Sequence, residues 1–204
     1  MKFYITALAC LGLSLLAAMT PAEVHRKLQT AYNNLSSYQA TVSQSNRYRN
    51  LSHTIDYSGR IYYSPGRMLM HFTSPQIQRL QIESGNITLY DAQSNTIMRS
   101  RMRPEFARMN PIELLQEYWG KSTVRVASEN RSFANVELTV SGDPIIRSIS
   151  ARVNRISGLV DRLSYTDASG NSVSYTFSDI RTNASIPASV WRYSYPADAQ
   201  EISP

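Results

Sequence analysis

Three histidines are the side chains of this sequence best suited to acid–base catalysis or to metal binding. His25 lies in a helical segment, His53 in a polar turn, and His71 on the less apolar side of a strand. None has a partner at the spacing of a metal site. The sequence also contains no Gly-x-Ser-x-Gly elbow, no phosphate-binding glycine loop and no paired carboxylates in a shared setting. We therefore expect that the protein is not an enzyme and holds no metal and no cofactor.

A second group of side chains is suited to binding apolar ligands. Met68, Met70 and Phe72 alternate with Leu69 and His71, so in a strand they share one face. Thioethers and rings adapt to ligands of variable shape, although methionine is also an ordinary core filler. Other residues of this kind are Met98, Met102 and Met109, and tyrosines that either line a cavity mouth or pack as ordinary strand residues: Tyr62, Tyr63, Tyr90, Tyr165, Tyr175, Tyr193 and Tyr195.

The elements that must position these residues are two helices and a long series of strands. Val24, Leu28, Ala31 and Leu35 recur at helical spacing over 21–36. A second helix is predicted within 104–120, where Asn110 begins a capping pattern. Short alternating runs predict strands at 38–49, 54–64, 67–73, 79–83, 87–91, 96–102, 123–128, 134–141, 146–154, 160–167, 172–179 and 190–195.

This order predicts a mainly β fold with helices, of the α+β class. A single antiparallel sheet of about eleven strands must curl to bury a face, which gives an unclosed half-barrel with an N-terminal helix and a helical lid. Residues 167–171 predict a tight hairpin turn between two tyrosine-rich strands. We find no linker and no repeat, so 23–204 is expected to form one domain.

The N-terminus has the layout of a signal peptide. Lys2 precedes an uncharged run over 3–19, which is short for a membrane span of roughly 20 residues. A retained membrane anchor is the alternative. We expect a signal peptide over 1–22, cut between 18 and 22: after Ala22 if Thr20 and Ala22 form the recognition site, or after Ala18 if Thr20 is kept as a helix cap. Cys10 faintly resembles a lipidation site, but cleavage would remove it and leave no thiol.

The formal net charge of +6 at pH 7 is a mild basic bias. Arg99, Arg101, Arg103 and Arg108 cluster in one stretch, which favours anionic headgroups or an acidic partner, unless they form an ordinary solvated loop. The basic residues match no nucleic-acid recognition motif, so no nucleic acid is expected.

Two sets of motifs together resemble the LolA-type outer-membrane lipoprotein carriers. The first set is Gly59-Arg60-Ile61-Tyr62-Tyr63, Pro65-Gly66-Arg67, Phe72-Thr73-Ser74-Pro75, Gly85-Asn86 and Leu89-Tyr90-Asp91. The second is Leu163-Ser164-Tyr165-Thr166-Asp167, Gly170-Asn171, Tyr175-Thr176-Phe177-Ser178-Asp179, Asn183, Ile186-Pro187 and Trp191-Arg192-Tyr193-Ser194-Tyr195-Pro196. Each motif is loose, but their order and spacing span nearly the whole mature chain.

The resemblance implies an incomplete barrel whose apolar cavity takes up acyl chains in the periplasm. The cargo would be a lipoprotein or a related lipid, received by a monomer from an inner-membrane ATP-driven exporter and passed to an outer-membrane acceptor, with transient contact to the membrane surface. The expected cavity residues are Tyr63, Met68, Met70, Phe72, Leu80, Ile82, Leu89, Tyr175, Phe177 and Trp191. The expected contacts to headgroups or partners are Arg67, Arg99, Arg101 and Arg103.

The helix over 110–120 matches the family's lid by position. Its expected lid residues are Ile112, Leu114, Leu115, Tyr118 and Trp119. The chain departs from the family pattern at Ser64, because the best-known carriers place there an arginine that holds the lid closed. Arg67 is nearby but not equivalent, which leaves the latch and the cargo open.

Two other functions fit the same sequence. One is a periplasmic regulator on the same fold that binds an inner-membrane partner protein. The other is an accessory carrier for a different lipid, such as a polyketide or a glycolipid. The sequence does not separate these alternatives from the lipoprotein carrier.

Overall fold

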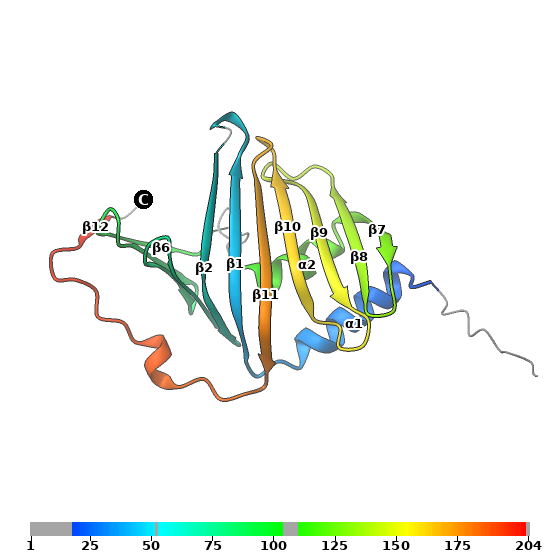
Figure 1. Cartoon of the computed structure of the whole chain (residues 1–204), viewed down its shortest axis with the longest axis horizontal. Coiled ribbons are helices and arrows are strands. Elements are labelled where there is room, and N and C mark those ends of the chain that lie inside the picture. Colours follow the sequence, from blue (N-terminus) through cyan, green and yellow to red (C-terminus); the bar gives the residue numbers. More distant parts are fainter. Residues whose placement is uncertain (1–17, 52, 104–109, 203–204) are drawn as a thin grey trace, which may run out of the picture.

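A single curled sheet with two helices on its concave side makes up this computed structural model (Figure 1), which describes residues 18–51, 53–103 and 110–202. Most of the predicted signal peptide, with Cys10, lies outside the described residues. Arg108 and Met109 also lie outside them.

The described residues form twelve strands and two α-helices. The helices are α1 (Pro21–Asn33) and α2 (Pro111–Trp119). The first strands are β1 (Tyr38–Tyr48), β2 (His53–Ser64), β3 (Arg67–Ser74), β4 (Gln78–Glu83), β5 (Asn86–Asp91) and β6 (Thr96–Arg101). They are followed by β7 (Ser122–Glu129), β8 (Phe133–Val140), β9 (Ile146–Asn154), β10 (Val160–Asp167), β11 (Ser172–Thr182) and β12 (Gln200–Ile202).

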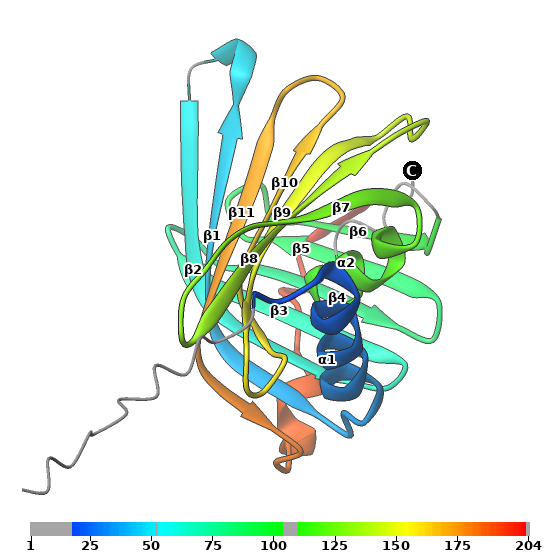
Figure 2. The same ribbon diagram turned by 90° about the vertical axis from the view of Figure 1, so that its right-hand side faces the viewer.

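The strand order is β12-β6-β5-β4-β3-β2-β1-β11-β10-β9-β8-β7, and the sheet does not close on itself. Neighbours are antiparallel except β12, which runs parallel to β6. The first and last long strands of the chain, β1 and β11, meet in the middle of the sheet, so the two halves of the sequence form its two wings. Figure 2 shows the wings curling round α1 and α2. The prediction of a mainly β, unclosed antiparallel half-barrel with an N-terminal helix is confirmed.

Alternation along the strands creates the core. Met68, Met70 and Phe72 of β3 point to the concave side of the sheet, as do Val136 and Leu138 of β8. Val24 and Leu28 of α1, one turn apart, are 0% and 1% exposed in the same core. Because period-two alternation places every second residue on the concave face, one continuous apolar core runs across both wings.

The predicted strand at 190–195 is wrong. The structure has a short 3₁₀ helix, η3 (Ala188–Trp191), and then residues without ladder partners. Pro187 and Pro196 flank this segment, and neither can donate a backbone hydrogen bond to a ladder. The chain crosses the convex face of the sheet with its rings turned towards the strands, and only Gln200–Ile202 pairs at an edge.

Candidate lipid-binding site

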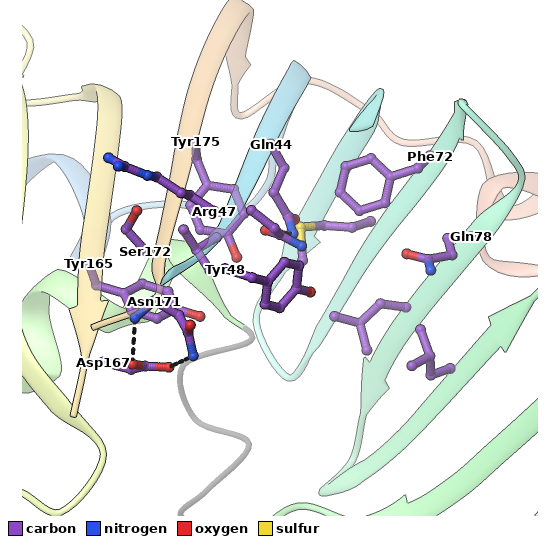
Figure 3. Close-up of a pocket in the computed structure, with 15 residues that line it drawn as sticks. Gln44, Arg47, Tyr48, Phe72, Gln78, Tyr165, Asp167, Asn171, Ser172 and Tyr175 are labelled. Atoms are coloured by element: carbon purple, nitrogen blue, oxygen red, sulfur yellow. Dashed lines mark hydrogen bonds between the residues drawn. The ribbon is translucent and has the colours of Figure 1, made fainter. Parts of the chain in front are cut away.

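A cavity of about 340 Å³ lies on the concave face, at the end of the sheet that carries the β1–β2 and β10–β11 hairpins (Figure 3). One wall is apolar and comes from β3, β4 and β5: Met70, Phe72, Leu80 and Leu89. The opposite wall comes from β1, β10 and β11, and includes Tyr165, Val173 and Tyr175. The two wings of the sheet therefore each contribute one wall of the cavity.

The mouth of the cavity is polar. Gln44, Asn46, Gln78, Asp167 and Asn171 line it. Asp167 Oδ1 accepts the backbone N–H of Asn171 at 2.9 Å, and Asn171 Nδ2 donates to Asp167 Oδ2 at 2.9 Å. Gln44 Nε2 donates to Asn46 Oδ1 at 2.8 Å. An apolar wall beneath hydrogen-bonding groups suits an amphiphile, with its chain inside and its polar head at the mouth.

Half of the predicted cavity residues line this cavity: Met70, Phe72, Leu80, Leu89 and Tyr175. Met68, Ile82 and Phe177 belong to the same concave core but pack between other side chains. Phe177 stacks on Tyr175, with ring centroids 6.1 Å apart. Tyr63 is partly buried against the core, and its hydroxyl donates to Glu113 Oε1 of α2 at 3.4 Å.

The structure places Trp191 on the convex face, away from the cavity. Its ring lies 4.1 Å from the guanidinium carbon of Arg67, and it shares a surface depression with Gln81 and Glu83. In β4 these two alternate with the concave residues Leu80 and Ile82. The expected cavity role of Trp191 is therefore not supported by its position.

Trp191, Tyr193 and Tyr195 form a cover over the convex face of β3 to β6, which we call the C-terminal cover. The ring of Tyr193 lies 5.9 Å from that of Tyr90 and 4.9 Å from the guanidinium carbon of Arg79. Arg79 is 3% exposed, and its Nη2 donates to the backbone oxygen of Val190 at 2.8 Å. Beneath the cover, three side chains that point to the convex face are only 1% to 5% exposed: Leu69, Tyr90 and Ile97.

The lid residues Ile112, Leu114, Leu115, Tyr118 and Trp119 are all buried, between 0% and 7% exposed. Trp119 stacks on His25 of α1 with centroids 4.9 Å apart. Burial lowers the pKa of His25, so this ring is neutral near pH 7. The Tyr118 hydroxyl donates to Asp143 Oδ2 at 2.9 Å. Helix α2 contributes none of the described residues that line the cavity, and in this state it packs on β7, β8 and α1.

The arginines predicted to contact headgroups lie mostly on the convex side. Arg67 pairs with Glu83 at 3.9 Å, and Arg99 Nε pairs with Glu201 of β12 at 2.9 Å. Arg101 and Arg103 are exposed. The cavity itself lies on the concave side, and the basic side chain among its described lining residues is Arg47, which the sequence reasoning did not select.

The polar residues of the mouth were also missed. Gln44, Asn46 and Asn171 come from strands and turns far apart in the sequence, and nothing in their local patterns separates them from other exposed polar residues. Tyr165 is one of the tyrosines that were predicted either to line a cavity mouth or to pack as ordinary strand residues. In the structure it lines the cavity.

Within 18–51, 53–103 and 110–202, no group of three His, Cys, Asp or Glu side chains is placed to hold a metal ion. His53 is exposed, and His71 lies 6.2 Å from the ring of Tyr193 on the convex face. Of the described helices, neither has the length and apolar character needed to cross a membrane.

This chain forms an unclosed half-barrel whose cavity, with an apolar wall, lies at the end of the concave face that the two helices do not cover. The family described as outer membrane lipoprotein carrier protein LolA matches residues 33–194, and the chain belongs to this family. No curated protein sequence matches it.

Solved structures share the fold at low sequence identity. An uncharacterized conserved protein from Thermus thermophilus is 15% identical, with a TM-score of 0.58 over 90% of this chain and 98% of that one. MucB in the MucA/MucB complex of Pseudomonas aeruginosa is 13% identical, with a TM-score of 0.51 over 85% of this chain and 61% of that one. These similarities establish the fold.

Replacing Trp191 by Ala tests whether this side chain stabilises the convex face of the sheet or contributes to the cavity. We expect the free energy of unfolding to fall by about 3 kcal/mol, because Leu69 and its neighbours lose their cover. Affinity for an acyl probe should stay unchanged, whereas Tyr175→Ala, which alters the cavity wall, should lower it. Denaturant titration and probe fluorescence measure the two effects. If the Trp191→Ala protein had normal stability and weakened probe binding, Trp191 would be part of the ligand site and not of the cover.

Proposed function

We propose that this protein is a periplasmic carrier that binds acyl chains of lipoproteins, or of a related lipid, and moves them from the inner to the outer membrane. The observation that carries this proposal is the amphiphilic cavity on the concave face of a member of the lipoprotein-carrier family. Its partners would be an inner-membrane ATP-driven exporter, an outer-membrane acceptor and the cargo itself. None of the described residues that line the cavity is a histidine, cysteine or lysine, so we propose binding without catalysis.

The cost of moving a lipid chain through water explains why a carrier is needed. Desorption costs about 0.8 kcal/mol per CH₂, hence about 12 kcal/mol for a chain of about sixteen carbons. Packing the chain against Met70, Phe72, Leu80 and Leu89 offsets most of this cost. The polar mouth leaves the head hydrated, which keeps binding reversible.

The size of the cavity bears on the role of α2. A volume of about 340 Å³ lies near the lower end of ligand pockets, and suits a single chain. A cargo with several chains requires α2 to move, which fits the proposed lid. In place of the family arginine, Ser64 accepts a hydrogen bond from Arg67 Nε at 3.0 Å, and the adjacent Tyr63 connects β2 to Glu113 of α2. Burial and the charge of Glu113 raise the pKa of Tyr63, so its hydroxyl stays protonated and able to donate.

A regulatory protein is the second candidate, favoured by the similarity to MucB in its complex with MucA. The two functions differ in their ligands. A carrier releases extracted lipid and binds acyl probes saturably, while a regulator of this kind binds a protein partner.

The first test is acyl binding by the mature protein. Lipids extracted from protein purified from its native periplasm should be detected by mass spectrometry, and a fluorescent fatty acid should bind saturably and be displaced by a lipopeptide. Leu89→Trp, which fills the cavity, should weaken binding at least about tenfold, because the chain loses contact area. Thr88→Trp, on the other face of the same strand, is the matched control. Equal losses in both variants, or no saturable binding by the intact protein, would refute the cavity as the binding site.

The second test concerns the latch. Tyr63→Phe removes the hydrogen bond between β2 and α2 but keeps the ring in the core, so we expect probe uptake to speed up by about fivefold at most, with little change in stability. Tyr62→Phe, the neighbour on the convex face, should leave the rate unchanged. Stopped-flow fluorescence measures both rates. Unchanged uptake in Tyr63→Phe would show that this contact does not hold the lid.

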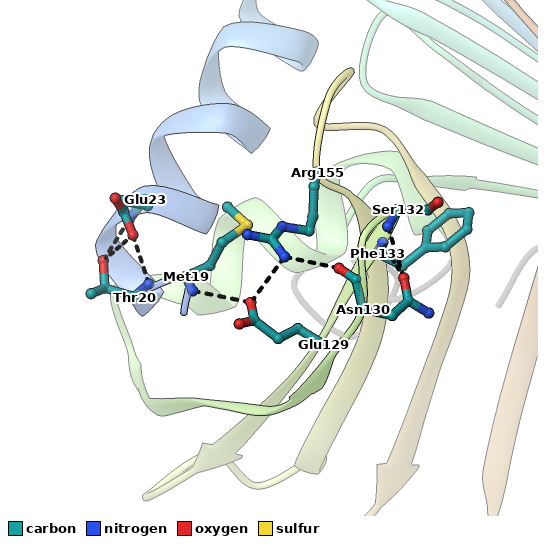
Figure 4. A network of polar contacts seen from close by, with 8 residues as sticks. All are labelled: Met19, Thr20, Glu23, Glu129, Asn130, Ser132, Phe133 and Arg155. Carbon is teal, nitrogen blue, oxygen red and sulfur yellow. Dashed lines mark hydrogen bonds and ion pairs between the residues drawn. The ribbon is translucent and has the colours of Figure 1, made fainter. Parts of the chain in front are cut away.

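The third test concerns export, which we propose occurs with cleavage after Ala18. Met19 is 8% exposed, and its backbone N–H donates to Glu129 Oε2 at 3.0 Å, while Arg155 Nη1 lies 3.7 Å from the same oxygen (Figure 4). Thr20 caps α1: the Glu23 backbone N–H donates to Thr20 Oγ1 at 3.2 Å, and the Thr20 N–H donates to Glu23 Oε2 at 2.8 Å. Cleavage after Ala18 keeps both arrangements and places a new ammonium group beside Glu129.

N-terminal sequencing and intact mass of the periplasmic protein decide the site. We expect the mature chain to start at Met19. A chain that starts at Glu23 would have lost the cap, and would show that the protease selects Thr20 and Ala22 regardless of the fold.

A further inference from the structure

The tip of the β1–β2 hairpin exposes an apolar residue between charged and aromatic neighbours. All five residues from Arg47 to Leu51 are exposed, with Leu51 at 72% and Tyr48 at 36%. Figure 1 shows that this hairpin projects at one end of the sheet, beside the β10–β11 hairpin. A single exposed leucine is common on protein surfaces. What distinguishes Leu51 is the set of residues around it.

A basic depression lies beside this tip. Arg47 and Arg49 line it together with the hydroxyl residues Thr54, Thr166 and Ser172, and no described carboxylate lines it. Neither arginine forms an ion pair with a described residue. Five other arginines do form such pairs, namely Arg67, Arg99, Arg125, Arg152 and Arg155.

The β10–β11 turn holds Arg49 in place. The backbone N–H of Arg49 donates to Asn171 Oδ1 at 3.1 Å. Gly170 has φ +82, and a Cβ on it would lie 2.8 Å from Arg49 Cδ, so the arginine side chain runs directly over this glycine. The guanidinium group is therefore positioned at the surface, with a geometry that guanidinium–phosphate contacts can use.

The tip is continuous with the cavity. Arg47 and Tyr48 line both the tip and the cavity mouth, together with Asn171 and Asp167 (Figure 3). A headgroup phosphate bound between the two arginines would thus lie next to the opening through which its chain enters.

From this arrangement we propose that the β1–β2 tip docks the protein on an anionic phospholipid bilayer. Leu51 and Tyr48 enter the interfacial region, and Arg47 and Arg49 contact lipid phosphates. The proposal rests on the proposed carrier function and places its membrane contact at the hairpin tip beside the cavity mouth, away from Arg67 and Arg99, which lie beside Trp191 and Tyr195 of the C-terminal cover. An acyl chain then passes between leaflet and cavity with little exposure to water.

Vesicle co-sedimentation tests the docking surface. The mature protein should bind vesicles of phosphatidylglycerol and phosphatidylcholine more tightly than vesicles of phosphatidylcholine alone, and added salt should weaken this binding. Arg49→Gln should lower the partition constant about fivefold, and Leu51→Ser about fivefold to tenfold. Matched controls are Arg147→Gln, an exposed arginine of β9, and Ile156→Ser, which is 87% exposed in the β9–β10 turn. Both controls should bind like the unchanged protein.

The outcomes separate docking from carrier function. Leu51 lines neither the cavity nor its mouth, so Leu51→Ser should keep its affinity for the soluble acyl probe while losing vesicle binding. Absence of a preference for anionic vesicles, or equal losses in the control variants, would overturn the docking proposal and leave cavity binding untouched. If Arg49→Gln weakens binding of inorganic phosphate but not of vesicles, the depression is an anion site and not a membrane contact.

Discussion

Burial of both faces of one long, open sheet is the constraint on which the rest of this structure depends. Twelve strands in a single layer expose two large surfaces, and a sheet of this length reduces them only by curling. The concave surface is covered by α1 and α2, which present Leu28, Leu114 and Leu115 to it. The convex surface of β3 to β6 is covered by Trp191, Tyr193 and Tyr195. The two covers differ in kind: one is helical and apolar, the other an extended segment of rings over cationic and apolar side chains.

The cavity follows from where the helices stop. Both helices pack mainly towards the β7 side of the concave face, as α2 does on β7 and β8. The opposite end, between Met70 and Tyr175, is left without a helical cover, so side chains of the two wings face one another across open space. The same end carries the hairpin turns, whose polar residues satisfy the backbone there. An apolar chamber with a polar mouth is thus a consequence of covering a long sheet with short helices.

The arginines of the sheet fall into two groups, one beside the C-terminal cover and one at the β1–β2 tip. Arg67, Arg79 and Arg99 sit under or beside aromatic rings on the convex face and contribute to holding the C-terminal cover. Cations on ring faces of this kind stabilise a fold modestly, and more where they are desolvated, as Arg79 is. Arg47 and Arg49, in contrast, share a depression with the hydroxyl residues Thr54, Thr166 and Ser172. The arginines therefore differ by their place along the sheet: those beside the C-terminal cover contact its rings, and those at the β1–β2 tip form no ion pair with a described residue.

Period-two alternation and capping patterns are local properties, so the sequence by itself determined the elements that depend on them. It determined the shared face of Met68, Met70 and Phe72, the opposite face of His71, the capped starts of both helices at Thr20 and Asn110, and the turn at Asp167. Only the tertiary structure decided which of the concave residues line the cavity, because this depends on how β1 and β11 pair and where the helices end. It also decided that Trp191 faces the convex side and that Arg47 lies at the cavity mouth. The path of a chain across a sheet, and the approach of turns about 120 residues apart, as Arg49 and Asn171 are, arise from long-range packing that no local pattern encodes.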